Sequence, residues 1–259
     1  MPAPLLAPAL VAVAFLVLPL IGLLIRAPWG QLARALSGPD ATHALVLSLW
    51  TASASTAISL IIGVPLAWLL ARTRFPGQRL LRSLVTLPLV LPPVVGGVAL
   101  LLAFGRTGFI GRLLDSWFGL TIPFTPVAVV MAETFVAMPF LILAVEGALR
   151  SADQGFEEAA ATLGARPFTV FRRVTLPMIS PAVGAGAVLC WARALGEFGA
   201  TITFAGSFPG QTETMPIAVY YTLENDPEAA IALSIVLLVV SVVVLVSLRD
   251  RWVRGGTVS

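Results

Sequence analysis

The chain has 259 residues, of which 58% are hydrophobic and only 11% are charged, whereas soluble domains carry about 25% charged residues. This composition excludes an ordinary soluble domain and indicates a surface that mostly faces lipid. The formal net charge is +3, and every Lys or Arg position is an arginine, so the chain lacks the lysine that a P-loop needs to reach the phosphates of ATP.

Composition also argues against a catalytic or metal centre. Cys190 is the single cysteine, which excludes an intrachain disulfide and a cysteine metal cluster. His43 is the single histidine, and we interpret it as a polar residue near the outer end of a span, because zinc and catalytic sites need several converging groups. We therefore expect no enzyme, no metal site and no cofactor bound by this chain. The high isoelectric point reflects membrane topology, not nucleic-acid binding.

Apolar runs long enough to cross a membrane recur along the whole chain, since each approaches or exceeds the roughly 20 residues that a spanning helix needs. They lie at 8–25, 44–71, 81–104, 125–149, 178–205 and 229–248. We therefore expect an all-α, polytopic membrane protein with six transmembrane helices. The first run lacks a basic start and a clear cleavage site, so we interpret it as a retained span and not as a secretory signal.

The arginines are distributed unequally between the two sides of this predicted bundle. Eleven lie after even-numbered spans, at Arg72, Arg74, Arg79, Arg82, Arg150, Arg166, Arg172, Arg173, Arg249, Arg251 and Arg254. Four lie on the opposite side, at Arg26, Arg34, Arg106 and Arg112. Positive residues favour the cytoplasmic side, so we expect both termini and the segment 150–177 to be cytoplasmic.

The second, third and fourth spans carry features with more than one interpretation. Small hydroxyl residues fill the second span, at Ser48, Thr51, Ser53, Ser55, Thr56 and Ser59; close helix packing is favoured, with a water-lined pathway as the second interpretation. Pro92 and Pro93, followed by Gly96, predict a kink in the third span, which serves either packing or a gate hinge. Glu133 is expected near the outer end of the fourth span, where water can hydrate it.

The segment 150–177 is charged and amphipathic between two apolar runs. Ser151 and Gln154 have the spacing of a capping box, and apolar residues then follow at helical spacing at Phe156, Ala159, Ala160 and Leu163. Gly164 can end this helix in a left-handed turn, and Pro167 suits the first position of the next helix. We expect two short helices at an angle, with a surface of small residues that a partner can approach.

One spacing in this segment resembles a known motif. Glu158-Ala159-Ala160, three residues, Gly164, nine residues and then Val174-x-Leu176-Pro177 are similar to the cytoplasmic coupling loop of ABC-importer permeases, with Val in place of the usual Ile. The resemblance implies an ABC type I importer permease fold and contact with a separate ATPase subunit. It assigns that contact to Glu157, Glu158, Ala159, Ala160, Leu163, Gly164, Ala165 and Pro167.

The fifth span contains two charges, which are costly in a membrane. Arg193 and Glu197 are four residues apart and can meet on one helix face, although this order is the weaker one for a helical ion pair. One interpretation is a local pair that stabilises helix packing, and the other places the pair beside a pathway for an anion. We also predict that Gly199, Thr201 and Thr203 line a constriction.

Longer segments around this pair resemble one family of permeases. Trp191–Gly206, Pro209–Tyr221, Leu87–Val95 and Thr134–Phe140 are similar to molybdate permease subunits, although Ser207 stands where that group often has Asn. Sulfate and thiosulfate permeases share the Leu-Gly-Glu-Phe/Tyr-Gly segment, so they stay open as an alternative. A secondary anion transporter is a further alternative, but we find no clear internal repeat.

The resemblance implies the remaining expectations. Residues 1–42 would form the first transmembrane helix and an outer loop, 43–250 the permease core with five further spans, and 251–259 a cytoplasmic tail. The chain would pair with a second copy in a bacterial inner membrane. It would work with two ATPase subunits that hold ATP and Mg²⁺, and with an external molybdate-binding protein, to import molybdate and also tungstate.

Overall fold

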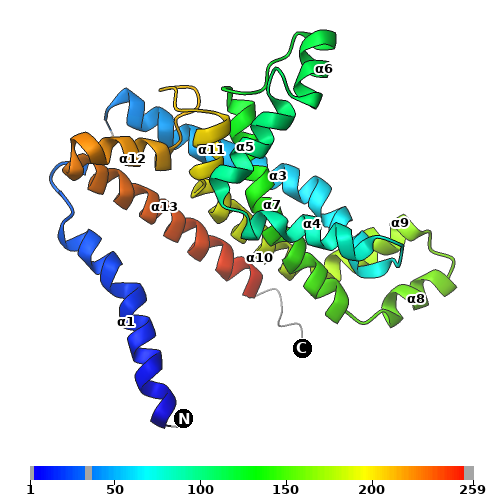
Figure 1. Cartoon of the computed structure of the whole chain (residues 1–259). Helices are drawn as coiled ribbons and strands as arrows, with labels where there is room; N and C mark the ends of the chain where they lie inside the picture. The colour runs from blue at the N-terminus through cyan, green and yellow to red at the C-terminus, as the bar shows by residue number, and fades with distance from the viewer. Residues whose placement is uncertain (1–2, 33–36, 254–259) are drawn as a thin grey trace.

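A computed structural model describes residues 3–32 and 37–253, which form helices joined by short loops, with no strand in those ranges (Figure 1). The helices are α1 (Ala3–Ile25), α3 (Pro39–Arg72), α4 (Gln78–Val90), α5 (Pro93–Phe104), α6 (Phe109–Phe118), α7 (Pro126–Ser151), α8 (Gly155–Thr162), α9 (Pro167–Val170), η1 (Phe171–Thr175), α10 (Leu176–Leu195), α11 (Gly199–Phe204), α12 (Met215–Asn225) and α13 (Pro227–Val253). Arg34 and Arg254 lie outside the described residues, as does the end of the predicted tail. The all-α prediction is confirmed.

Five helical segments are long and apolar enough to cross a membrane. They are Leu5–Ile25, Pro39–Arg72, Pro126–Ser151, Pro167–Leu195 and Pro227–Val246. A sixth span results if α4 and α5, which are bent by 119° at a short break, are counted together. The predicted set of six is therefore recovered only with a broken third span. Figure 1 shows α1 standing clear of the other helices, and no part of its most apolar window is buried.

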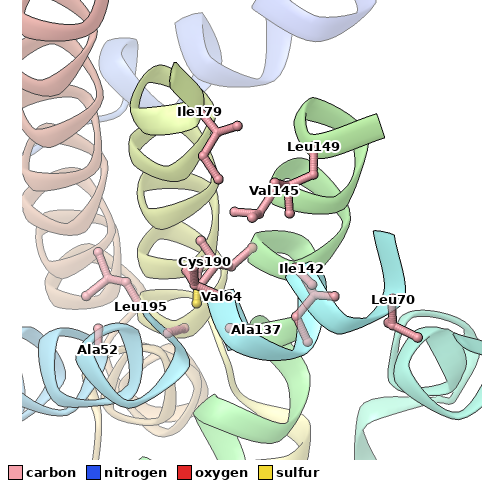
Figure 2. Packing of buried hydrophobic residues seen from close by; sticks show 13 residues of the cluster. Ala52, Val64, Leu70, Ala137, Ile142, Val145, Leu149, Ile179, Cys190 and Leu195 are labelled. Carbon is pink, nitrogen blue, oxygen red and sulfur yellow. The ribbon is translucent and has the colours of Figure 1, made fainter. Parts of the chain in front are cut away.

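The core lies where α3, α7 and α10 pack side by side. Figure 2 shows Val145 and Leu149 of α7 close to Ile179 of α10, in a cluster that also includes Leu70 and Cys190. Glycines let these backbones approach: a Cβ on Gly63 would lie 3.3 Å from Ile142 Cγ1, and one on Gly186 would lie 3.0 Å from Leu141 Cδ1. Small residues are the usual device for close helix packing in lipid, where burial from water does not drive association.

The predicted kink in the third span is a complete break. Leu91 is extended after α4, Pro92 is the N-cap of α5 and Pro93 is its first residue, which suits proline because a first-turn N–H needs no helical partner. The glycines that follow do not make this bend. Gly96 lies inside α5, where an added Cβ would be 3.0 Å from the ring of Phe135, so its small size serves packing against α7.

The fifth span ends earlier than predicted. α10 ends at Leu195, and residues 199–204 form the separate helix α11. The continuous apolar run 178–205 concealed this interruption. Gly196 caps α10 and Phe198 lies outside helical geometry before α11 begins. A tight approach holds α11 against α5, since a Cβ on Gly97 would lie 2.7 Å from the carbonyl oxygen of Ala200. Glycine is therefore required at position 97.

Candidate functional site

The segment 150–177 forms a projecting turn at the end of the bundle where α3 ends and α7 ends (Figure 1). α8 covers Gly155–Thr162, and Gly164 follows with φ of +82°, in the left-handed region that favours glycine. The amide of Ala165 donates to the carbonyl of Ala160 at 3.1 Å, which satisfies one of the last carbonyls of the helix. Pro167 then begins α9. The predicted roles of Gly164 and Pro167 in the turn are confirmed.

Two details of the predicted turn are wrong. Ser151 does not cap α8, because it is the last residue of α7 and its hydroxyl donates to the carbonyl of Gly147. The second helix is not short either. α9 continues through the π-helical segment η1 into α10, so that Pro167–Leu195 is one helical segment of 29 residues. A single wide turn marks this continuation, which is a common form of π-helix inside α-helices.

The residues assigned to the ATPase contact divide between two faces of the turn. Glu158, Ala159, Gly164 and Pro167 are exposed, and Leu163 is 88% exposed. Glu157, Ala160 and Ala165 are half-buried. A large exposed apolar side chain beside small residues is typical of a protein interaction surface when it is part of a contiguous patch. Phe156 and Phe168 of the same segment are two further exposed apolar side chains, at 61% and 73%.

Glu157 faces the bundle and joins three helix ends. Its Oε1 accepts a hydrogen bond from Arg72 Nη2 of α3 at 3.0 Å, and another from Thr175 Oγ1 of η1 at 3.0 Å. Alongside, Trp68 meets Phe171 edge to face at a centroid separation of 6.4 Å. Glu157, Thr175 and the two aromatic residues border a pocket of about 190 Å³ under the turn. The turn is therefore attached to the bundle through specific polar contacts.

A second charged cluster joins helix ends at the same side. Glu146 of α7 accepts from Arg82 and Arg150, with nitrogen–oxygen distances of 2.8 Å in both pairs. Arg82 also donates to the carbonyl of Leu70 at 3.2 Å, and Gln78 donates to the same carbonyl at 2.8 Å. The carbonyl of Leu70, near the end of α3, is thus satisfied by two side chains of α4, as helix ends require.

The predicted meeting of Arg193 and Glu197 is confirmed. Arg193 Nη2 lies 2.5 Å from Glu197 Oε2, with side chains 28% and 1% exposed. Glu197 Oε1 also accepts the backbone N–H of Ala200 at 2.8 Å, so the carboxylate satisfies a first-turn donor of α11. Both contacts of Glu197 join parts of this chain, as the helix-stabilisation interpretation requires. The pathway interpretation stays a prediction.

The run of small and hydroxyl residues after this pair packs within the bundle. A Cβ on Gly199 would lie 2.9 Å from Pro93 Cβ. Thr201 is buried with no hydrogen-bond partner for its hydroxyl among the described residues, whereas Thr203 donates to the carbonyl of Gly199 at 2.7 Å. Their role in a constriction stays a prediction.

The hydroxyl residues of the second span form a buried face of α3. Ser48, Thr51, Ser55, Thr56 and Ser59 are all buried. Ser48 Oγ accepts the backbone N–H of Met215 at 2.7 Å, and Thr134 donates to Ser55 at 3.2 Å. These contacts agree with the favoured interpretation, which is close helix packing. Ser53 differs, since Trp191 Nε1 donates to it at 3.2 Å beside an open groove of about 360 Å³.

The sequence predicted a hydrated Glu133 at the outer end of its span, but this prediction is wrong because the residue is buried. It is 1% exposed, and Thr51 Oγ1 donates to its Oε1 at 2.8 Å. Its Oε2 has no hydrogen-bond partner within the described ranges. The residue lies two turns into α7, where the helix already packs on α3. An ionisable group buried in a spanning helix is costly, and its partner is therefore structurally important.

A family model described as "Binding-protein-dependent transport system inner membrane component" matches residues 63–255. The chain therefore belongs to this family of multi-pass membrane permeases. The Molybdenum transport system permease protein ModB of Mycobacterium tuberculosis is 50% identical over 244 residues, which cover 94% of this chain and 92% of the relative. ModB of Escherichia coli is 42% identical over 81% of this chain and 92% of its own.

More distant relatives extend the comparison. The Sulfate transport system permease protein CysT of Salmonella typhimurium is 35% identical, over 93% of this chain and 88% of its own length. A crystal structure of a bacterial ABC transporter that imports alginate matches with a TM-score of 0.77 at 20% identity, covering 97% of this chain and 94% of that one. The methionine transporter MetNI matches with a TM-score of 0.60 at 21% identity, over 82% and 96% of the two chains. These structures establish the ABC-importer permease fold.

Proposed function

We propose that this chain is the permease subunit of an ATP-driven importer that moves molybdate, and the chemically similar tungstate, into the cytoplasm. The observation that carries this proposal is the 50% identity to a molybdenum permease over almost the full length of both chains. Sulfate permeases are less similar, at 35% identity, which favours molybdate. Sulfate or thiosulfate import is the second candidate, because those relatives also match nearly the whole chain.

The proposed complex contains two copies of this chain, two ATPase subunits that bind ATP and Mg²⁺, and an external molybdate-binding protein. In support, a solved alginate ABC transporter with this fold is in complex with a periplasmic protein that carries its ligand. We place the complex in a bacterial inner membrane with both termini in the cytoplasm, following the arginine distribution. The division into 1–42, a core at 43–250 and a tail at 251–259 belongs to the same proposal.

The projecting turn would supply the contact with the ATPase. Its exposed residues Glu158, Ala159, Leu163 and Gly164 would seat in a groove of that subunit, with Ala160 and Ala165 behind them. ATP-driven closure of the two ATPases would then move the turn and switch the spans between inward-open and outward-open states. This works only if nucleotide binds one of those states more tightly than the other.

The ion would pass between the two permease copies. The open groove of about 360 Å³ is lined by small or apolar residues of α3, α10 and α13 together with Trp191, and we place it on the face toward the second copy. Arg193 would offset the charge of the oxyanion, and Pro92 and Pro93 would act as the hinge of a gate. Selectivity would reside mainly in the binding protein, because a pathway that holds a dianion tightly releases it slowly.

Transport in proteoliposomes tests this function. The chain is reconstituted with the ATPase and the binding protein, and uptake of labelled molybdate is measured with tungstate, sulfate and thiosulfate as competitors. We expect uptake that requires ATP and that tungstate reduces more than sulfate does. Stronger competition by sulfate would favour the second candidate, and uptake without nucleotide that follows an ion gradient would indicate a secondary transporter.

A further inference from the structure

We propose that Glu157 is the positioning residue that fixes α8 to the ends of two spanning helices, so that a displacement of the turn moves α3 and α10 together. One carboxylate oxygen carries this link, because Glu157 Oε1 accepts from both Arg72 and Thr175 at 3.0 Å. Arg72 is the last residue of α3, and Thr175 directly precedes α10. This inference rests on the proposed function, since it assigns a mechanical role within the coupling to an ATPase.

The link is largely shielded from solvent although it lies at the surface of the bundle. The side chains of Arg72 and Glu157 are only 6% and 17% exposed. Arg72 Nε and Nη1 have no hydrogen-bond partner among the described residues, so the guanidinium depends on Glu157 for its charge partner. Removing one member of such a pair leaves the other charged and buried, which costs much more than the pair itself contributes. The turn is thereby held in one position.

Helix ends favour the same arrangement. Glu157 lies in the first turn of α8, where the helix dipole stabilises a negative charge, and Arg72 lies in the last turn of α3, where it stabilises a positive one. The hydroxyl of Thr175 adds the start of the next span. Residues of α3 and of the start of the α10 span therefore meet at a single acceptor atom of α8.

The neighbouring glutamate provides a contrast. Glu158 is exposed, and its side chain makes no hydrogen bond or ion pair to the bundle among the residues that the structure describes, whereas Glu157 points inward. Consecutive residues on α8 thus face in different directions, one toward solvent and the other toward the spans. We infer that Glu158 contributes to the docking surface and that Glu157 transmits the force that docking applies.

The test compares Glu157→Gln, Thr175→Val and the exchanged pair Arg72→Glu/Glu157→Arg in the complete complex with its ATPase and binding protein. Molybdate uptake and ATP hydrolysis are measured in the same proteoliposomes. Arg74→Gln is the matched control, because Arg74 is exposed and lies two residues from Arg72. For Glu157→Gln we expect normal assembly and at least about a fivefold fall in molybdate imported per ATP. The exchanged pair should recover part of that loss.

Hydrogen exchange gives a second readout that needs no transport. In the purified permease, Glu157→Gln should increase exchange at the amides of α8, and Arg74→Gln should not. If Glu157→Gln fails to assemble, Arg72→Met/Glu157→Leu removes both charges together, which buried pairs commonly tolerate. That double variant should fold and still import few ions per ATP.

The outcomes separate this proposal from the function on which it rests. If the wild-type complex shows no ATP-dependent uptake of any oxyanion, the proposed function is wrong, and the exchange experiment alone decides whether Glu157 anchors α8. If the wild type imports molybdate and Glu157→Gln retains the wild-type ratio of ions to ATP, the positioning role is overturned. Unchanged exchange in α8 would overturn it as well.

Discussion

Glu197 Oε1 accepts the backbone N–H of Ala200 at 2.8 Å, so a carboxylate from the break after α10 holds the first turn of α11. The other oxygen of the same carboxylate contacts Arg193 at the end of α10. One buried side chain therefore connects the two helices across the interruption in the fifth span. A glutamate within an apolar run thereby acquires a structural role at a helix boundary.

Replacement of Glu197 should distinguish its two contacts. Glu197→Gln keeps an oxygen that can accept from Ala200, whereas Glu197→Ala leaves that buried N–H unsatisfied. We expect the alanine variant to lose about 1–3 kcal/mol of stability and the glutamine variant to lose less. Thermal unfolding in detergent, followed by tryptophan fluorescence, measures both. Equal losses would show that the bond to Ala200 contributes little.

Arg193 provides the test of the pathway interpretation. Its side chain remains 28% exposed despite the contact with Glu197, so it can also face an ion. Arg193→Gln should leave the complex assembled and reduce molybdate uptake by about fivefold or more, because a desolvated charge–anion interaction is lost. The measurement is initial uptake at several molybdate concentrations. Wild-type rates in both Arg193→Gln and Glu197→Gln would restrict the pair to helix stabilisation.

The left-handed turn at Gly164 should be sensitive to substitution. Gly164→Val places a β-branched residue at φ of +82°, a conformation that costs on the order of 1–3 kcal/mol. Ala160→Leu enlarges the small surface beside it. We expect both variants to hydrolyse ATP with reduced dependence on uptake, measured in proteoliposomes. Tight coupling in both would argue against docking of the ATPase at this turn.

Gly97 should be essential for the contact between α5 and α11. A Cβ at this position would lie 2.7 Å from both the carbonyl oxygen of Ala200 and Thr203 Cβ, and neither backbone nor β-carbon can move easily. Gly97→Val should therefore destabilise the protein by about 1–3 kcal/mol through overpacking. Gly30→Val, where an added Cβ meets nothing within 4 Å, is the control. Equal thermal stability of the two variants would contradict the close approach.

Thr51 should be required because of the carboxyl group that it contacts. Thr51→Val removes the hydrogen bond to Glu133 Oε1 and leaves a buried carboxyl without a partner, at a cost of about 1–3 kcal/mol. The double variant Thr51→Val/Glu133→Leu removes both polar groups and should regain much of that stability. Denaturation of the purified permease provides the comparison. A double variant no more stable than the single one would refute the explanation.

Local chemistry predicted the parts of this fold that depend on a few adjacent residues. The left-handed turn at Gly164 and the helix start at Pro167 follow from backbone preferences alone. The Arg193–Glu197 contact follows from a spacing of four residues. Pro92 and Pro93 indicated a bend for the same reason, since proline removes backbone donors. Each of these features is decided within one or two helical turns.

Features set by packing between distant segments could not be read in this way. Arg72 and Glu157 are 85 residues apart, and only the charge bias of their loops was visible in the sequence. Glu133 lies in an apolar run that gives no sign of which face meets α3. The interruption after Leu195 was hidden for a related reason, because Gly196 and Gly199 also suit tight packing inside a continuous span.

The uninterrupted course from Pro167 to Leu195 has a geometric consequence. A helix of 29 residues is about 44 Å long at 1.5 Å per residue, whereas the hydrocarbon layer is about 30 Å thick. If the helix stands perpendicular to the membrane, about 14 Å of its length extends beyond the hydrocarbon layer. We assign this protruding part to the end that begins at Pro167. A force on this protruding end would tilt the membrane-embedded part of the helix as one rigid body, because no break separates the two.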